Sequence, residues 1–212
     1  MTDLWSERAA AYRGATEHAG GEDLDVLVHW CGAGSGVTVI DVATGGGHTA
    51  RALREAGCTV VTVDAAPGMH PDVIGRAEDL PFANDSFDAA VCRIAPHHFD
   101  DVGAAMAELA RVARRVVVED TLYVSEVVEE AERLRDPTHV RSYSEAEWRE
   151  LFAGAGLEVE DVAFVEKRRP VDEWLARTGC TGAEALRVRS LLADQIDGDD
   201  YVDTKILLRG VR

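Results

Sequence analysis

The sequence lacks a long apolar run. A helix needs roughly 20 predominantly apolar residues to cross a bilayer, and no stretch of the 212 residues approaches that length. The first residues also lack the basic segment and following apolar segment of a secretory signal peptide. We therefore expect a cytoplasmic protein that makes no membrane contact.

Cysteine is scarce and dispersed. The four cysteines, Cys31, Cys58, Cys92 and Cys180, form no C-x-x-C pair. Cysteine metal sites and redox motifs use closely spaced pairs, so we predict packed, reduced thiols and no metal site.

Basic residues are also few. Lys and Arg number 22 against 39 Asp and Glu, which gives a formal net charge of −17. Such a surface repels phosphate backbones and anionic lipid headgroups. Nucleic acid is therefore not expected as a partner, and a small or a cationic molecule fits the overall charge better.

The composition is that of a globular protein. Hydrophobic residues make up 46% and charged residues 29% of the chain. The length predicts a single domain over residues 1–212, with a helical leader over 1–36 in which helices are expected at 3–13 and 22–32.

Apolar segments alternate with helical patterns through the rest of the chain. Strands are expected at 37–42, 58–63, 87–93, 115–119, 157–165 and 205–211, with helices at 48–56, 102–113 and 145–155. Apolar strands separated by helices predict an α/β fold, with a parallel sheet covered on both faces. Residues 122–143 and 170–196 exceed simple crossovers and are predicted to form helical insertions that cap a ligand crevice.

A glycine turn follows the first strand of this pattern. Gly45-Gly46-Gly47-His48-Thr49-Ala50 matches the dinucleotide fingerprint G-x-G-x-x-A. Glycines let a ligand approach the backbone, and the helix start offers free N–H groups to a negative group. The match alone is weak, because a tight strand-to-helix turn needs the same residues.

An acidic residue ends the second strand. Asp64 lies 19 residues after Gly45, the position at which a carboxylate binds both ribose hydroxyls of a nucleotide. An Asp at a strand end can also cap a helix. Together with the turn it favours ribose binding, without separating an adenosine sulfonium ligand from NAD.

The ordered set of motifs resembles the class I S-adenosylmethionine-dependent methyltransferases of the ubiquinone/menaquinone methyltransferase-like branch. The resemblance runs from about Tyr12 to the C-terminus. Its motifs are Val39-Ile40-Asp41-Val42-Ala43-Thr44-Gly45-Gly46-Gly47-His48-Thr49-Ala50, Ala77-Glu78-Asp79-Leu80-Pro81-Phe82, Asp85-Ser86-Phe87-Asp88, Cys92-Arg93-Ile94-Ala95-Pro96-His97-His98-Phe99 and Asp136-Pro137-Thr138-His139-Val140-Arg141-Ser142-Tyr143-Ser144.

The resemblance implies a doubly wound, mostly parallel seven-stranded sheet with S-adenosylmethionine as cofactor. It places Asp41 near the methionine amine, where it would orient the turn, and runs the backbone from Ala43 through Thr44 and Gly45 to Gly47 beneath the methionine and ribose. In the same way it implies contacts of Asp64 with the ribose, of Ala65, Ala77 and Glu78 with the adenine, and of the Arg93 carbonyl with the methionine end.

The chain departs from the family pattern at several positions. Ala43 replaces the first glycine of the turn, and Arg76 stands where an Asp is usual. Between Asp64 and Ala77 the chain is short and carries Pro67, so the family's usual helix is predicted to be missing there. These departures leave open a protein that binds the cofactor without methylating. An NAD-dependent oxidoreductase is a further alternative, although the Leu-Pro-Phe and Ser-Phe-Asp stretches have no role in it.

Histidines are the candidate proton acceptors. His97 follows the fourth strand at the sheet edge where ligands bind, and His139 lies in the first insertion. A neutral imidazole suits a general base near pH 7, so these two are predicted as catalytic, with local structural roles as the alternative.

The acceptor is predicted to be a small molecule. His18, Arg141 and Tyr143 are the candidate residues that bind it. The insertions are expected to supply an apolar pocket through Leu122, Tyr123, Val127, Leu134, Trp174 and Leu175. The alternative is that both insertions form the interface of a homodimer.

Overall fold

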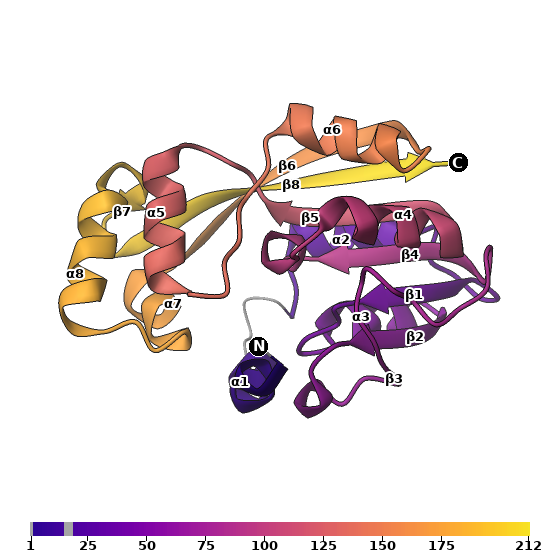
Figure 1. Cartoon of the computed structure of the whole chain (residues 1–212), viewed down its shortest axis with the longest axis horizontal. Coiled ribbons are helices and arrows are strands. Elements are labelled where there is room, and N and C mark those ends of the chain that lie inside the picture. The colour runs from indigo at the N-terminus through magenta and orange to yellow at the C-terminus, as the bar shows by residue number, and fades with distance from the viewer. Residues whose placement is uncertain (1, 15–18) are drawn as a thin grey trace.

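A computed structural model of the chain describes residues 2–14 and 19–212. Its centre is one sheet with the strand order β3-β2-β1-β4-β5-β8-β6, and a short strand β7 pairs with β8 (Figure 1). The parallel strands are β1 (Thr38–Val42), β2 (Thr59–Asp64), β3 (Val73–Ile74), β4 (Phe87–Arg93) and β5 (Ala113–Thr121). Strand β8 (Asp200–Val211) runs antiparallel to both β5 and β6 (Glu158–Pro170).

Helices cover both faces of this sheet. Side chains alternate between faces along a strand, so Val39 of β1 packs with α2 (Glu22–Trp30) and α3 (His48–Glu55), whereas Ile40 packs with α4 (Val102–Val112) and α6 (Glu145–Gly154). The doubly wound α/β fold is therefore confirmed. Helix α6 begins at the capping box formed by Ser144 and Glu147.

The two longest strands, β6 and β8, extend beyond the ends of the other strands of the sheet. Strands β6 and β8 remain paired as far as Pro170 and Asp200, well past the boundaries expected from the sequence. This ribbon leads into a cap that contains α5 (Glu126–Arg135), α7 (Val171–Arg177), α8 (Gly182–Leu191) and β7 (Ile196–Asp197), on the left of Figure 1. Residues 122–143 and 170–196 thus contribute to one helical cap.

Helix α1 (Thr2–Gly14) lies between the cap and the sheet (Figure 1). Arg8 binds Asp136 of the cap at 3.0 Å, and Ser6 accepts a hydrogen bond from the Gly68 amide at 3.1 Å on the sheet side. A Cβ added at Gly68 would lie 2.6 Å from Ser6 Cα, so the backbones touch. Of the expected leader, α1 bridges the two halves, whereas α2 packs on the sheet. Along the described residues, no helix has the length and apolar character needed to cross a bilayer.

A buried ion network joins α2, β4 and β5. The Arg93 guanidinium binds Asp23 at 2.5 Å and Glu119 at 2.7 Å, and Lys167 also pairs with Asp23. Burial raises the pKa of Glu119 to about 7, although Arg93 opposes the shift. Arg93 and Lys167 hold the pKa of Asp23 well below its usual value.

Glu119 is expected to make stability depend on pH. Its pKa is higher in the folded protein than in the unfolded chain, so its contribution is complete below about pH 4.5 and is lost as the pH rises through 7. We expect Glu119 to contribute a fall of on the order of 1–3 kcal/mol in the free energy of unfolding between pH 5 and 8, and Glu119→Gln to remove this contribution from the pH profile. Urea unfolding across this pH range measures it.

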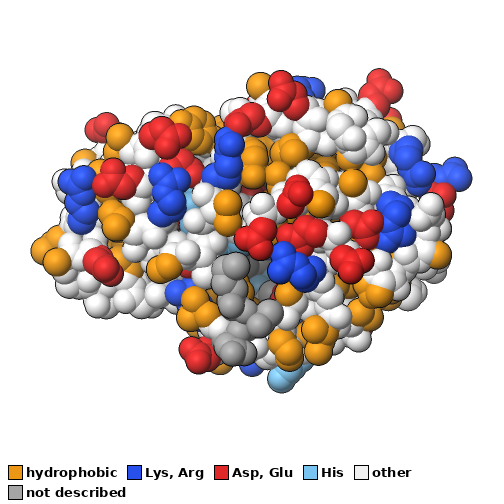
Figure 2. All heavy atoms as spheres, viewed as in Figure 1, with side chains coloured by type: hydrophobic (Ala, Val, Ile, Leu, Met, Phe, Trp, Pro, Cys, Tyr) orange, Lys and Arg blue, Asp and Glu red, His pale blue; other side chains and the backbone are white. Residues whose placement is uncertain are grey.

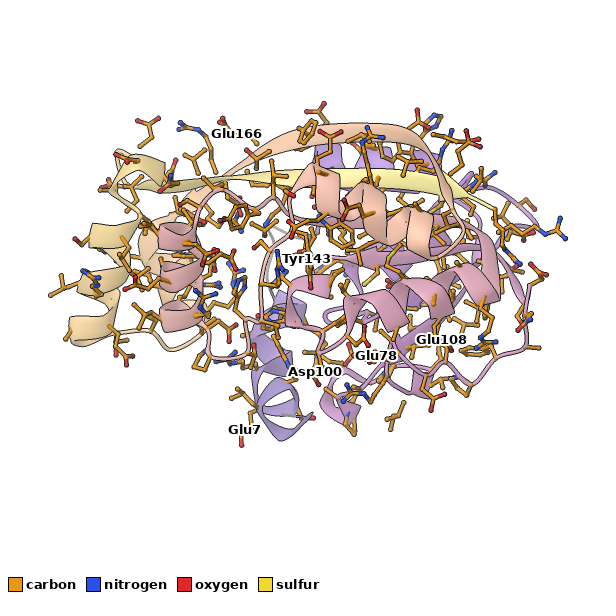
Figure 3. The ribbon with its side chains drawn as sticks, turned by 45° about the horizontal axis from the view of Figure 1, so that its top comes forward. Glu7, Glu78, Asp100, Glu108, Tyr143 and Glu166 are labelled. Atoms are coloured by element: carbon orange, nitrogen blue, oxygen red, sulfur yellow. The ribbon has the colours of Figure 1, made fainter. Side chains whose placement is uncertain are left out.

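The matched control is Glu166→Gln, because this side chain is largely exposed on β6 (Figure 3). It should keep the wild-type slope. An equal slope in Glu119→Gln and wild type would show that Glu119 does not titrate in this range.

Candidate active site

A cavity lies at the carboxyl ends of the central strands. The chain order reverses between β1 and β4, which are neighbours in the sheet, and open α/β sheets bind ligands at such a reversal. The cavity is bordered by the segments that follow β1, β2 and β4, by Trp5 and Tyr12 of α1, and by the cap.

The glycine turn forms one wall of this cavity. Ala43, Gly45 and Gly47 have φ angles of 56°, 52° and 74°, in the left-handed region that favours glycine. A Cβ at Gly45 would meet nothing closer than the Ala43 carbonyl at 4.0 Å, whereas one at Gly46 would lie 2.6 Å from the Tyr12 carbonyl. Helix α1 therefore packs against Gly46, whereas the space beside Gly45 is open.

Asp64 is hydrogen-bonded directly to the glycine turn. Its Oδ2 accepts from the Gly45 amide and its Oδ1 from the Ala66 amide, both at 2.9 Å. Burial raises the pKa of Asp64 against these two bonds. Because a carboxylate has about four acceptor sites, both oxygens can still receive hydroxyl donors.

Asp41 and Gly47 support the turn without bordering the cavity. Asp41 is buried, and its Oδ2 accepts from the Thr44 hydroxyl at 2.6 Å. Burial raises the pKa of Asp41 to about 6. Of the turn residues, Ala43, Thr44, Gly45 and Gly46 border the cavity.

The wall after β2 differs from the family pattern in the way the sequence predicts. A short 3-10 turn (Pro67–Met69) and β3 replace a helix between Asp64 and Ala77. Ala65, Ala77 and Glu78 border the cavity. Arg76 also borders it and pairs with Glu78 and Asp100, each at 3.2 Å, on the face shown in Figure 3. Arg93, the last residue of β4, also borders the cavity, and its guanidinium lies in the ion network described above.

His97 borders the cavity after β4 and forms a hydrogen-bonded pair with Asp120. The Nδ1 atom of His97 lies 2.5 Å from Oδ1 of Asp120, and the His97 amide donates to Oδ2 at 2.8 Å. Asp120 is fully buried at the end of β5. A carboxylate on Nδ1 fixes the ring and leaves Nε2 as the nitrogen that can accept a proton.

Two further histidines lie against this pair. The ring centroid of His139 is 5.4 Å from that of His97, and its Nε2 lies 3.0 Å from Glu129. The ring of His98 is 4.0 Å from His97, and burial lowers the pKa of His98 well below its usual value. All three border the cavity. No cluster of His, Cys, Asp and Glu that could hold a metal occurs in the part of the chain that the structure describes.

The predicted acceptor-binding residues do not meet at this cavity. Arg141 is exposed, stacks on the Tyr143 ring at 4.6 Å and pairs with Glu147. Figure 3 shows Tyr143 in the connection between the cap and α6, and neither residue borders the cavity. His18 lies outside the described residues.

Most of the residues expected to line an apolar acceptor pocket do not border the cavity. Leu134, Trp174 and Leu175 pack with Tyr201 in a separate core of the cap, and Val127 is exposed. Of the apolar residues expected there, Trp174 alone also borders the cavity. The cap instead presents charged side chains to it, namely Glu132, Arg135, Asp136, Arg169, Arg177, Asp203 and Lys205.

Comparisons with known proteins decide the family. Residues 40–116 match the family described as methyltransferase domain. The uncharacterized methyltransferase YcgJ of Bacillus subtilis is 33% identical over 199 residues, covering 82% of this chain and 78% of that protein. The chain belongs to this methyltransferase family.

Other similarities agree with that assignment. The crystal structure of YcgJ matches with a TM-score of 0.80 and 28% identity, over 89% of this chain and 97% of that chain. A demethylmenaquinone methyltransferase of Corynebacterium kroppenstedtii is 37% identical over 87 residues, 37% of this chain and 38% of that protein. The resemblance expected from the sequence is therefore confirmed.

Proposed function

We propose that this methyltransferase transfers a methyl group from S-adenosylmethionine to a small-molecule acceptor in the cavity. The observation that carries the proposal is the cavity itself, which is bordered both by Asp64 with the glycine turn that is hydrogen-bonded to it and by His97, whose ring Asp120 holds. The residues proposed to bind the cofactor and the residue proposed to accept the proton thus border the same cavity.

The turn fits the cofactor. The space beside Gly45 is open, and the Asp64 carboxylate beside it retains acceptor sites for two ribose hydroxyls. Ala65, Ala77 and Glu78 border the adjoining space, where the adenine would lie. Bound S-adenosylmethionine supplies a methyl group that its sulfonium has already activated.

The chain itself contributes alignment, closure and a base. Helix α1 covers the cavity through Trp5 and Tyr12 and is fixed to the cap by Arg8. His97, held by Asp120 through Nδ1, would accept at Nε2 a proton from an acceptor hydroxyl, amine or carbon acid. In-line displacement depends chiefly on such alignment of the two reactants.

Calorimetric titration with S-adenosylmethionine, S-adenosylhomocysteine and NAD tests the proposal. Saturable binding of the first two without NAD binding is expected. Binding of NAD without binding of the other two would contradict the proposal and favour an NAD-dependent oxidoreductase. Binding of S-adenosylhomocysteine without methyl transfer to any fraction of a deproteinised metabolite extract would indicate a protein that binds without methylating.

Asp64→Ala is expected to weaken S-adenosylhomocysteine binding. The substitution removes a charged acceptor from the ribose hydroxyls, which costs about 1.5–3 kcal/mol, or roughly 10- to 150-fold in affinity. Calorimetry measures the change.

Asp72→Ala is the matched control. Asp72 also follows β2 and accepts hydrogen bonds from Thr62, but it does not border the cavity. This variant should bind normally. Equal affinities of the Asp64→Ala variant and wild type would remove Asp64 from the binding site.

A further inference from the structure

The cap end of the cavity is built from two paired strands. Tyr201, Asp203 and Lys205 share one face of β8 because side chains alternate along a strand, and Arg169 is the β6 partner of Tyr201. Lys205, Asp203 and Arg169 all border the cavity. The ribbon thus carries a row of charged groups to the end of the cavity beneath the cap.

One carboxylate is shared by two cations in this row. Asp203 accepts from Arg169 through Oδ1 and from Lys205 through Oδ2, the latter at 2.8 Å. Lys205 also donates to the Thr121 hydroxyl. The side chains of Arg169 and Lys205 are 8% and 3% exposed, so two cations that share one ion-paired carboxylate are held away from water.

Both cations retain donors. The buried Nε of Arg169 has no hydrogen-bond partner among the described residues. The Lys205 ammonium has three donors, of which the two bonds above use two. A buried donor without a partner is costly, and a ligand that accepts from it removes that cost.

Arg169 and Lys205 carry the opposite sign to the net charge of the protein. Figure 2 shows several acidic side chains gathered near the middle of one face of the molecule, whose net charge is −17. At the cap end of the cavity, Arg169 and Lys205 lie beside the one carboxylate with which both form ion pairs, Asp203. Two buried cations that retain hydrogen-bond donors favour an anionic ligand at this end of the cavity.

We propose that Arg169 and Lys205 bind an acidic group, a carboxylate or a phosphate, on the methyl acceptor. The inference rests on the proposed function and names its substrate class as a small acid. The acidic group at the cap end would orient the acceptor with its reacting atom toward His97 and the glycine turn, since all of these border one cavity.

Anion titration of the protein saturated with S-adenosylhomocysteine tests this site. The probes are inorganic phosphate and benzoate, each exchanged for chloride at constant ionic strength and followed by calorimetry. Saturable binding of at least one probe is expected, and phosphate chemistry is separated from carboxylate chemistry by which of the two binds. Arg169→Leu should weaken that binding at least about tenfold, because a charge-assisted contact is lost.

Arg187→Leu is the matched control. Arg187 is an exposed arginine of α8 that pairs with Glu130 and does not border the cavity. It should leave anion binding unchanged. If Arg169→Leu does not fold, a measurement on wild type alone still tests the site. Phosphate or benzoate should raise the melting temperature of wild type above its value in chloride.

Three results would overturn the proposal. The first is no saturable binding of either probe to wild type, and the second is equal binding by Arg169→Leu. The third is loss of S-adenosylhomocysteine binding by Arg169→Leu with methylthioadenosine binding intact, which would assign the cations to the carboxylate of the cofactor. If wild type binds anions but not S-adenosylhomocysteine, the proposed function fails and the anion site remains.

Discussion

Gly45→Val is expected to abolish S-adenosylhomocysteine binding while the protein remains folded. A Cβ at Gly45 would have only the Ala43 carbonyl within 4.0 Å, so the valine side chain would occupy the cavity space beside Asp64. The positive φ of 52° adds backbone strain of about 1–2 kcal/mol, which lowers stability without unfolding a domain of ordinary stability. Calorimetry with circular dichroism measures both effects.

Gly156→Val is the control that separates the effect of backbone strain on stability from the blocking of the cavity by the valine side chain. Gly156 has a φ of 75°, has open space around its Cβ position and lies between α6 and β6, away from the cavity. This variant should lose similar stability and bind the ligand normally. Normal binding by Gly45→Val would mean that the ligand does not cross the turn.

His97→Gln is expected to slow methyl transfer by about 10²- to 10⁴-fold, the usual contribution of a general base. Glutamine retains hydrogen bonding but cannot accept the proton, and Asp120 then has no imidazole to orient. S-adenosylhomocysteine affinity should stay within about twofold of wild type, because Asp64 and the glycine turn, not His97, would hold the ribose. The rate is followed as S-adenosylhomocysteine release with a deproteinised metabolite extract as acceptor source.

His29→Gln is the control for the loss of an imidazole. His29 is exposed on α2 and does not border the cavity, so its variant should keep the wild-type rate. An unchanged rate in His97→Gln would remove this histidine from the chemistry. A large loss in His139→Gln alone would transfer the role to His139, which lies 5.4 Å away.

Local sequence patterns predicted the elements near the cofactor wall. The apolar run from Phe87 to Arg93 is β4 as expected, and the capping box at Ser144 starts α6. The turn and Asp64 were predicted to act together, and the Gly45 amide does bind Asp64. Such features depend on a few neighbouring residues and on the fixed geometry of parallel strands.

The cap end depended on distant pairings that no local pattern shows. Arg169 and Asp203 lie where charged residues interrupt the apolar alternation of β6 and β8, so the strands were expected to be shorter than they are. Trp174 packs on Tyr201 at 4.2 Å and Leu175 lies in the same core, so only part of the expected pocket wall borders the cavity. Asp120 was missed because its bond to His97 follows from the register of β5 against β4.

A crystal structure with bound S-adenosylhomocysteine tests the central claim most directly. The account predicts the ribose hydroxyls on Asp64 and the sulfur in the space between the glycine turn and His97. Methyl transfer requires reacting atoms about 3–3.5 Å apart, so a base must lie within a few ångströms beyond that distance. A sulfur more than about 10 Å from both the His97 and His139 rings, or a ribose away from Asp64, would contradict it.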